Sequence, residues 1–318
     1  MEPLLIIAFL DGRLGHEKQT RGVLQAIADR TPVSVAYRSL PKVSFSLAMK
    51  QWSAYIRGSL YRRQKDREVM VDLIIGSGAY THIPMLLLKK TTGARVITCM
   101  RPDRLLVQKI DLCFIPFHDR VKPADNVFIT TGPPSAIPFT NTHDPVKGLF
   151  LIGGIDKRSH QWNSERLVRQ VKTILEREPS MKWTISTSPR TPKNMIPMLE
   201  ELTAECANVS VVYSETTPSG WIETAYQHHA MVWVTADSIS MIYESLIAGC
   251  RVGILPVQWK KKDSKFIRVE KELLDKKWVY SYEKWFSGKE TEIQPVRLDE
   301  AGRCAVEILK RWWPGRLL

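Results

Sequence analysis

A chain of 318 residues with 44% hydrophobic and 25% charged side chains is long enough for two domains and too apolar to remain disordered. Its five cysteines are scattered without Cys-x-x-Cys spacing, which argues against a disulfide framework or a cysteine zinc site and favours the reducing cytoplasm. The net charge of +13 predicts an anionic partner. No stretch approaches the roughly 20 apolar residues of a membrane span, so we expect no transmembrane segment.

The first half of the sequence alternates apolar runs with helical patterns. Strands are expected at 4–10, 33–37, 73–75, 95–98, 112–115 and 127–129, and helices at 19–28, 45–66 and 84–90. A polar, proline-rich stretch over 132–145 then indicates an interdomain linker.

The pattern restarts in the second half. Strands are expected at 148–152, 182–186, 209–213 and 231–234, with a first helix over 164–177. Strands that alternate with helices predict parallel sheets with right-handed crossovers. The sequence therefore predicts an α/β protein with a first lobe at 1–140 and a second lobe at 141–318.

Two loops of the first lobe carry residues that are candidates for catalysis or ligand binding. Asp11, His16 and Glu17 follow the first strand, where candidate general bases are commonly placed. The segment Gly76-Ser-Gly-Ala-Tyr80 follows another strand, and its glycines permit close approach of a ligand or of another backbone. A simple strand-to-helix turn has the same composition in both places.

Two segments of the second lobe indicate an anion site. Ser186-Thr-Ser-Pro-Arg190 offers hydroxyls and an arginine after a strand, which suits phosphate contacts. The run from Val232 to Val257 reads as a strand, a polar turn, a helix, a glycine stop and a strand. Such a helix N-terminus favours a diphosphate, and Glu244 would meet a ribose diol. An ordinary crossover with a Ser or Asp N-cap is the alternative.

Basic and aromatic residues mix in two further segments, 50–67 and 309–318. The first carries Trp52, Arg57, Arg62 and Arg63, a composition that suits an element lying on anionic lipid. A helix with a solvated basic face and an apolar core face is the other interpretation. The chain has no zinc finger, aromatic RNP-like strand or Gly-x-x-Gly loop, so we expect no nucleic-acid partner.

These motifs together resemble the Elm family, named for a plant mitochondrial-fission factor, and more broadly the two-domain GT-B glycosyltransferases. Within that fold class the chain is most similar to the enzyme type that adds N-acetylglucosamine to a lipid-linked peptidoglycan precursor. The matching motifs, which span residues 10 to about 257, are Asp11-Gly…Gly-His-Glu17, Gly76-Ser-Gly-Ala-Tyr80, Thr81-His-Ile-Pro84, Met100-Arg-Pro102, Pro116-Phe-His-Asp119, Gly153-Gly154, Ser186-Thr-Ser-Pro-Arg-Thr-Pro192, Thr235-Ala-Asp-Ser-Ile-Ser-Met241, and Glu244 five residues before Gly249.

The resemblance implies two Rossmann-like lobes that face a central cleft, with the last helix (about 299–313) able to pack back on the first lobe. The first lobe would bind the acceptor through Gly15, Ser77, Gly78 and Tyr80. The second would bind the nucleotide sugar through Gly153, Gly154, Ser188, Arg190, Ser238, Ser240 and Glu244. The first loop lacks the fuller glycine run of the peptidoglycan enzyme, so the base stays open among Asp11, His16 and Glu17, with Asp11 preferred.

The sequence therefore predicts an inverting, metal-independent glycosyltransferase that needs no cofactor and uses a nucleotide-diphosphate sugar as donor. No Asp-x-Asp motif occurs in the chain. The expected acceptor is a lipid-anchored envelope glycan of the lipopolysaccharide kind, reached from the inner face of the cytoplasmic membrane. A nucleotide-sugar 2-epimerase and a non-catalytic membrane-associated scaffold are the alternatives.

Overall fold

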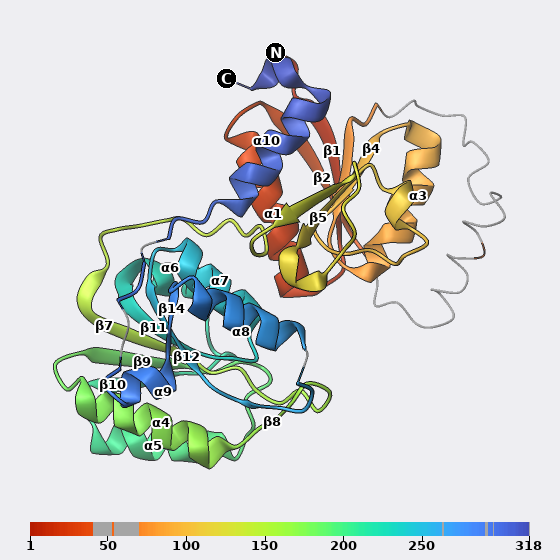
Figure 1. Cartoon of the computed structure of the whole chain (residues 1–318). Helices are drawn as coiled ribbons and strands as arrows, with labels where there is room; N and C mark the ends of the chain where they lie inside the picture. Colours follow the sequence, from red (N-terminus) through yellow and green to blue (C-terminus); the bar gives the residue numbers. More distant parts are fainter. Residues whose placement is uncertain (41–52, 54–69, 263, 290–291, 295, 318) are drawn as a thin grey trace. The chain divides into compact units, whose positions relative to one another are not determined.

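The computed structural model of the chain describes residues 1–40, 53, 70–262, 264–289, 292–294 and 296–317. It divides into two compact units, drawn in Figure 1: unit 1 comprises Met1–Ala136 and Asp299–Leu318, and unit 2 comprises Ile137–Leu298. Among the helices of these described ranges, none is long and apolar enough to cross a membrane. Trp52, Arg57, Arg62 and Arg63, predicted to contact lipid, lie outside the described residues.

Unit 1 is built on a six-stranded parallel sheet in the order β2-β1-β3-β4-β5-β6. Its strands are β1 (Leu4–Leu10), β2 (Val33–Ser39), β3 (Leu73–Gly76), β4 (Arg95–Thr98), β5 (Leu112–Pro116) and β6 (Val127–Thr130). Along β1, Ile6 and Ala8 join the core on one face, whereas Ile7 and Phe9 join the core on the other. Both faces of the sheet are therefore covered, as a parallel sheet requires.

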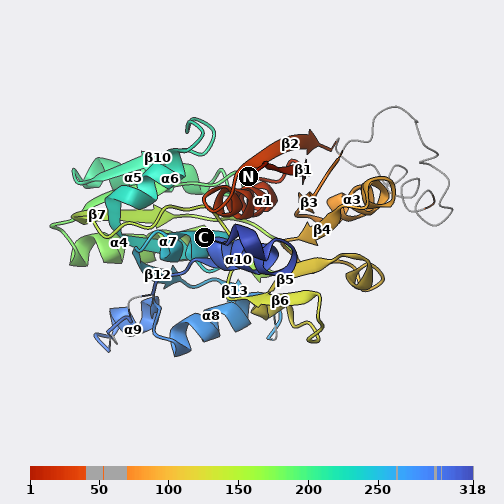
Figure 2. The same ribbon diagram turned by 90° about the horizontal axis from the view of Figure 1, so that it is seen from above.

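Helices α1 (Leu14–Ala28) and α10 (Glu300–Trp312) cover one face of this sheet, and α3 (Ala79–Thr92) covers the other. Figure 2 shows α1 and α10 side by side, and Ile27 and Ile308 meet in their shared core. Short 3-10 turns lie at Val107–Lys109, Phe117–Asp119 and Pro314–Arg316.

The C-terminal segment 309–318, one of the two basic and aromatic segments, packs into unit 1. Trp312 and Trp313 lie against the core under α10. Arg311 donates to the Asp125 carbonyl at 2.6 Å, and Arg316 donates to the Glu2 carbonyl at 2.7 Å. These aromatic rings and guanidinium groups therefore stabilise the unit.

Unit 2 repeats the design with a six-stranded parallel sheet in the order β10-β9-β7-β11-β12-β14. Its strands are β7 (Asp144–Leu151), β9 (Lys182–Ser186), β10 (Val209–Val212), β11 (His229–Thr235), β12 (Arg251–Leu255) and β14 (Val279–Ser281). An antiparallel ribbon of β8 (His160–Gln161) and β13 (Gln258–Trp259) lies apart from this sheet.

Helices cover the unit 2 sheet on both faces, as Figure 1 shows. They are α4 (Ser164–Arg177), α5 (Met195–Glu205) and α9 (Tyr282–Phe286) on one face, and α6 (Trp221–His228), α7 (Ile239–Ile247) and α8 (Lys265–Asp275) on the other. Trp183 and Trp233 fill the core under α4, α5 and α9. Gly148 and Gly253 make room for their indole rings, because a side chain at either glycine would overlap one of them.

Two helix boundaries differ from the prediction. The first helix begins at Leu14 and not at Gln19, because Gly15 is accepted in a first turn whose His16 and Glu17 amides both bond to the Arg13 carbonyl. His16 and Glu17 therefore lie in the first turn of a helix.

The third helix begins at Ala79 and not at Pro84, which lies inside it. Pro84 removes the amide that would have bonded to Tyr80, and its ring crowds the Tyr80 carbonyl. The helix still forms because it packs Ile83, Met85 and Leu86 into the core. The predicted α/β class with two parallel sheets is confirmed, whereas the expected central cleft stays a prediction.

Candidate functional site

The candidate residues of unit 1 gather where its sheet reverses its strand order. From β1 the chain passes to β2 on one side, and β3 then pairs with β1 on the other side. Ligands of open α/β sheets bind beyond the carboxyl ends of the strands at such a switch point. Asp11 directly follows β1, and Ser77 and Gly78 directly follow β3.

Asp11 and His16 form a hydrogen-bonded pair at this switch point. Asp11 Oδ2 lies 2.8 Å from His16 Nδ1, with the Asp11 side chain 1% exposed and the His16 side chain 22% exposed. An ionised carboxylate can only accept, so Nδ1 carries the proton and a neutral ring keeps its lone pair on Nε2. The geometry makes His16 a proton acceptor that Asp11 orients.

Gly78 lets the start of α3 approach this pair. Its φ of +108° lies in the region that favours glycine, and a Cβ there would overlap the Asp11 carboxylate and His16 Nδ1. The Gly78 amide donates to Met100 Sδ at 2.7 Å. The Asp11–His16 pair therefore requires glycine at position 78.

We expect Gly78→Ala to destabilise unit 1 and to separate Asp11 from His16, because the methyl group overlaps both side chains. Overpacking of this kind costs about 1–3 kcal/mol, measurable by urea unfolding. Gly93→Ala is the control, because Gly93 also has a positive φ but has open space around it. Equal losses in the two variants would show that backbone strain alone matters.

The other predicted residues of unit 1 surround the pair in different ways. Glu17 Oε1 accepts from the Gly12 amide at 3.1 Å, which fixes the turn before α1. Tyr80 is exposed, with the Arg13 guanidinium 5.6 Å from its ring centre. Gly15 is exposed, whereas Ser77 is buried and accepts from Thr20 at 3.0 Å. Tyr80 and Gly15 are accessible to an acceptor, and the Ser77 side chain is not.

Neighbouring titratable groups in unit 1 are held neutral by burial. Burial lowers the pKa of His82 to about 4, an effect that Asp103 opposes and His16 reinforces. His82 Nε2 lies 3.1 Å from Thr98 Oγ1. Burial likewise raises the pKa of the Cys99 thiol to about 12, which a hydrogen bond with Ser77 partly offsets. At neutral pH neither group supplies a charge beside His16.

The candidate residues of unit 2 gather at the switch point of the second sheet. From β7 the chain passes to β9 on one side, and β11 pairs with β7 on the other. Gly153 and Gly154 follow β7, and Asp237 and Ser238 follow β11. Sequence segments more than 80 residues apart thus meet at one edge of the sheet.

Asp237 and Arg190 form an ion pair over the glycine turn. Arg190 Nη2 lies 2.8 Å from Asp237 Oδ2, which also accepts from the Gly154 amide at 3.2 Å. Arg190 Nη1 donates to the Gly154 carbonyl at 3.2 Å. The Arg190 side chain remains 41% exposed while that of Asp237 is 1% exposed. The pair positions a guanidinium group at the edge of the sheet.

Three hydroxyl groups hold the glycine turn in place. Ser188 Oγ and Thr191 Oγ1 each donate to the Gly153 carbonyl at 2.7 Å. Thr235 Oγ1 accepts from the Gly153 amide at 2.8 Å. Ser188, named from the sequence as a nucleotide contact, is buried. The network fixes the backbone that a ligand would meet.

Helix α7 begins beside this turn with no side-chain cap. Ser238 occupies the N-cap without a capping hydrogen bond, as do the N-cap residues of α5, α6 and α9, whereas Asn163 of α4 and Ser264 of α8 both accept one. The first amides of α7 thus have no side-chain acceptor at the N-cap, which suits an anion there. Ser240 is half-buried in the first turn.

Glu244 lies one turn further along α7 and is buried. Burial raises the pKa of the Tyr226 hydroxyl, and the charge of Glu244 raises it further.

Asp237 and Thr191 are the site residues that the sequence reading left without a role. Both fall inside motifs that were recognised, and the available signal was a carboxylate in the polar turn after a buried strand. Their partners lie far away along the chain, so pairing with Arg190 and Gly153 was not readable. In the part of the chain that the structure describes, no three His, Cys, Asp or Glu residues form a group that could hold a metal ion.

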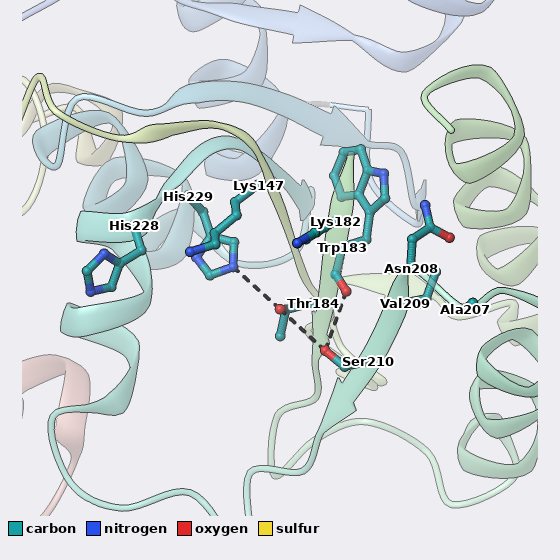
Figure 3. A pocket seen from close by; sticks show the side chains of 10 residues that line it. All are labelled: Lys147, Lys182, Trp183, Thr184, Ala207, Asn208, Val209, Ser210, His228 and His229. Carbon is teal, nitrogen blue, oxygen red and sulfur yellow. Dashed lines mark hydrogen bonds between the residues drawn. The ribbon is translucent and has the colours of Figure 1, made fainter. Parts of the chain in front are cut away.

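A hollow of about 600 Å³ lies at the other edge of the unit 2 sheet. Figure 3 shows Lys147, Lys182 and His229 around it, with Thr184 and Ser210 on the strands. His229 Nε2 lies 3.4 Å from Thr184 Oγ1. The residues that line it come from β7, the first halves of β9 and β10 with the turn before β10, the end of α6 and the start of β11, so the hollow is separate from the switch point.

Comparison with known proteins gives one family and a group of similar folds. The sequence model of the family described as mitochondrial fission ELM1 matches residues 14–312. No curated protein sequence matches the chain.

Solved structures with the same fold include two described as 2-epimerases, and MurG. A putative UDP-N-acetylglucosamine 2-epimerase from Listeria monocytogenes has a TM-score of 0.62 at 11% identity, over 97% of this chain and 95% of that one. The UDP-GlcNAc 2-epimerase from Methanocaldococcus jannaschii has a TM-score of 0.60 at 12% identity, over 98% of this chain and 100% of that one. MurG from Acinetobacter baumannii has a TM-score of 0.56 at 14% identity, over 97% of this chain and 94% of that one. These likenesses confirm the predicted GT-B type of fold.

Proposed function

The chain belongs to the mitochondrial fission ELM1 family, and from its GT-B fold and the clusters at its two switch points we propose that it is a glycosyltransferase that uses a nucleotide sugar. The observation that carries the proposal is the unit 2 turn, where Gly153 and Gly154 lie beside the uncapped start of α7 and the exposed Arg190 guanidinium. Backbone amides at a helix start together with a guanidinium group are suited to a diphosphate.

The donor would bind through unit 2. Arg190 has N–H groups left after its bonds to Asp237 and Gly154, and these would pair with phosphate oxygens. Ser238 and Ser240 would offer hydroxyls at the start of α7, and Glu244 would accept from ribose hydroxyls. UDP-GlcNAc is the first donor to test, because two similar structures contain an epimerase bound to it.

The base would be His16, with Asp11 as its positioning residue. His16 Nε2 would take the proton of an acceptor hydroxyl while that oxygen forms a bond to the sugar C1. The bond from C1 to the diphosphate oxygen breaks with inversion, and its electron pair leaves on the nucleoside diphosphate. Arg190 and the α7 amides would stabilise that departing charge. This assignment gives Asp11 the orienting role and replaces our sequence-based preference for it as the base.

The finer parts of the proposal concern the acceptor and the setting. We propose a lipid-anchored envelope glycan as acceptor, of the lipopolysaccharide kind, and a peripheral position on the inner face of the cytoplasmic membrane. The net charge of +13 supports an anionic partner, and the exposed Gly15 and Tyr80 support an acceptor site next to His16. The reaction is proposed to run without a metal ion or cofactor.

Replacement of Arg190 by alanine and of Glu244 by glutamine should each weaken nucleotide binding by about 1–3 kcal/mol, the range for losing a charged hydrogen bond. Calorimetric titration with UDP measures the effect. Arg190→Lys should recover only part of the loss, because it keeps the charge without the fork. Arg166→Ala, at an exposed position on α4, is the control. Unchanged affinity in folded Arg190→Ala and Glu244→Gln proteins would refute the donor site.

A thermal-shift screen with nucleotides and nucleotide sugars tests the proposal as a whole, because a ligand of the native state raises the melting temperature. Conversion of UDP-GlcNAc to its 2-epimer without an acceptor would replace the transferase by an epimerase. Absence of any shift would favour a non-catalytic scaffold.

A further inference from the structure

A positively charged surface adjoins the glycine turn of unit 2. It consists of the ribbon β8–β13 with the flanking residues, that is, the described residues of 155–161 and 258–265, and we name it the basic ribbon. In the sequence, residues 155–161 and 258–265 carry six lysine and arginine residues against two aspartates. The side chains of Lys157, Arg158, Lys260, Lys261, Lys262 and Lys265 are all exposed. Charge of one sign is therefore concentrated on a small area.

Backbone pairing brings these cations together from two distant segments. Gln258 pairs with Gln161 and Trp259 pairs with His160 in the antiparallel ribbon. The Lys260 amide donates to the Ser159 carbonyl at 3.0 Å, and Lys260 Nζ donates to the Lys157 carbonyl at 2.6 Å. The charged loops are thus held side by side by the fold.

Among the described residues, the nearby carboxylates of Asp156 and Glu270 have hydrogen-bond partners other than the lysines. Asp156 accepts from the Arg158 amide at 3.0 Å and from Ser159 Oγ at 2.9 Å. Glu270 accepts from Trp259 Nε1 at 3.2 Å, and burial raises the pKa of Glu270. Within the described ranges no carboxylate oxygen lies within 4.0 Å of Lys157, Lys261 or Lys262. Their mutual repulsion is relieved best by an external anion.

We propose that the basic ribbon binds the surface of an anionic phospholipid membrane. Lysines dominate it, and their compact charges suit a diffuse negative surface. Ile155, 44% exposed, adds an apolar contact at the same place. Single-stranded nucleic acid needs open aromatic faces, but Trp259 and Phe266 are half-buried and stack on each other with ring centres 4.9 Å apart.

Membrane binding by the basic ribbon would bring the donor edge of unit 2 to the lipid surface. β8 follows β7 and β13 follows β12, so the ribbon lies at the carboxyl edge of the sheet. The Ile155 amide bonds directly to the Arg190 carbonyl at 3.0 Å. The inference stands on the charge and geometry of unit 2 and does not need the transferase proposal.

Flotation with vesicles of phosphatidylglycerol and phosphatidylcholine tests this surface in the full chain. We expect binding to the mixed vesicles, none to pure phosphatidylcholine, and loss of binding near 1 M salt, where the Debye length falls to about 3 Å. Lys157→Glu, Lys261→Glu and Lys262→Glu together should lower the partition coefficient by about 100-fold or more. Lys182→Glu, Arg251→Glu and Lys277→Glu change the net charge equally and should bind as the wild type does, because these exposed residues lie at the amino ends of β9 and β12 and before β14, at the opposite edge of the sheet.

Equal losses in the two triple variants would overturn the assignment, because net charge alone would then explain them. Retained binding by the ribbon variant would overturn it too, as would a wild type that prefers short single-stranded RNA to the vesicles. UDP affinity of each variant is measured alongside. Vesicle binding by a protein that has no affinity for UDP would contradict the transferase proposal and still support the membrane-binding surface.

Discussion

Replacement of His16 by glutamine is expected to lower sugar transfer by about 10²-fold to 10⁴-fold, the usual contribution of a positioned general base. Glutamine keeps similar size and polarity but cannot take up a proton at neutral pH. The affinity for the nucleotide should stay unchanged, since the proposed donor residues all belong to unit 2. Single-turnover rates with a radiolabelled nucleotide sugar measure the chemical step, and UDP titration measures binding.

Substitution of Asp11, the partner of His16, tests the same proposal in a second way. Asp11→Asn removes the negative charge that holds Nδ1 protonated, so the ring can present the wrong tautomer, and turnover should fall although His16 is intact. His228→Gln, an exposed histidine of unit 2, controls for the loss of an imidazole. Normal turnover in a folded His16→Gln protein would exclude His16 as the base and return the choice to Asp11 or Glu17.

Substitution of Gly154 by alanine is expected to abolish measurable donor binding. A Cβ at this position would overlap the carbonyl of Arg190 and the amide of Thr191, which are backbone atoms and cannot turn aside. The loop 188–191 would have to move, and with it the guanidinium group that Asp237 holds over the turn. We expect at least about a 100-fold loss of UDP affinity, together with the roughly 1–3 kcal/mol of instability that overpacking brings.

Gly315→Ala is the matched control for that variant, because Gly315 has open space and no positive φ. Circular dichroism and urea unfolding separate a displaced loop from an unfolded unit. If Gly154→Ala binds UDP normally, the glycine turn is no part of the donor site.

The fold was largely readable from the sequence because parallel strands leave a strong signal. β1 was predicted at its observed bounds, since its apolar run ends sharply at Asp11. Helix starts were harder. Gly15 and Pro84 are residues that often end a helix. Gly15 lies in the first turn of α1, and α3 continues through Pro84 because its neighbours Ile83 and Met85 pack into the core.

The positions of the site residues could be predicted from the sequence, but their hydrogen-bond and ion-pair partners could not. His16 and Arg190 were found because they follow strand ends, whereas their bonds to Asp11 and Asp237 depend on side-chain directions that spacing does not encode. Ser188 looked like a phosphate ligand, yet its hydroxyl is used by the Gly153 carbonyl. A hydroxyl after a strand has two possible partners, and only the packed loop decides between them.

The return of α10 to unit 1 has a consequence for the order in which the chain folds during synthesis. Residues 137–298 form one continuous segment, so unit 2 can complete its core as soon as they have left the ribosome. Unit 1 cannot, because Ile308 and Leu309 close the core over Val23 and Ile27. Residues 1–136 must therefore wait, with the part of the sheet face that α10 covers still exposed, until α10 has been synthesised. That interval is when a nascent chain of this protein most needs a chaperone.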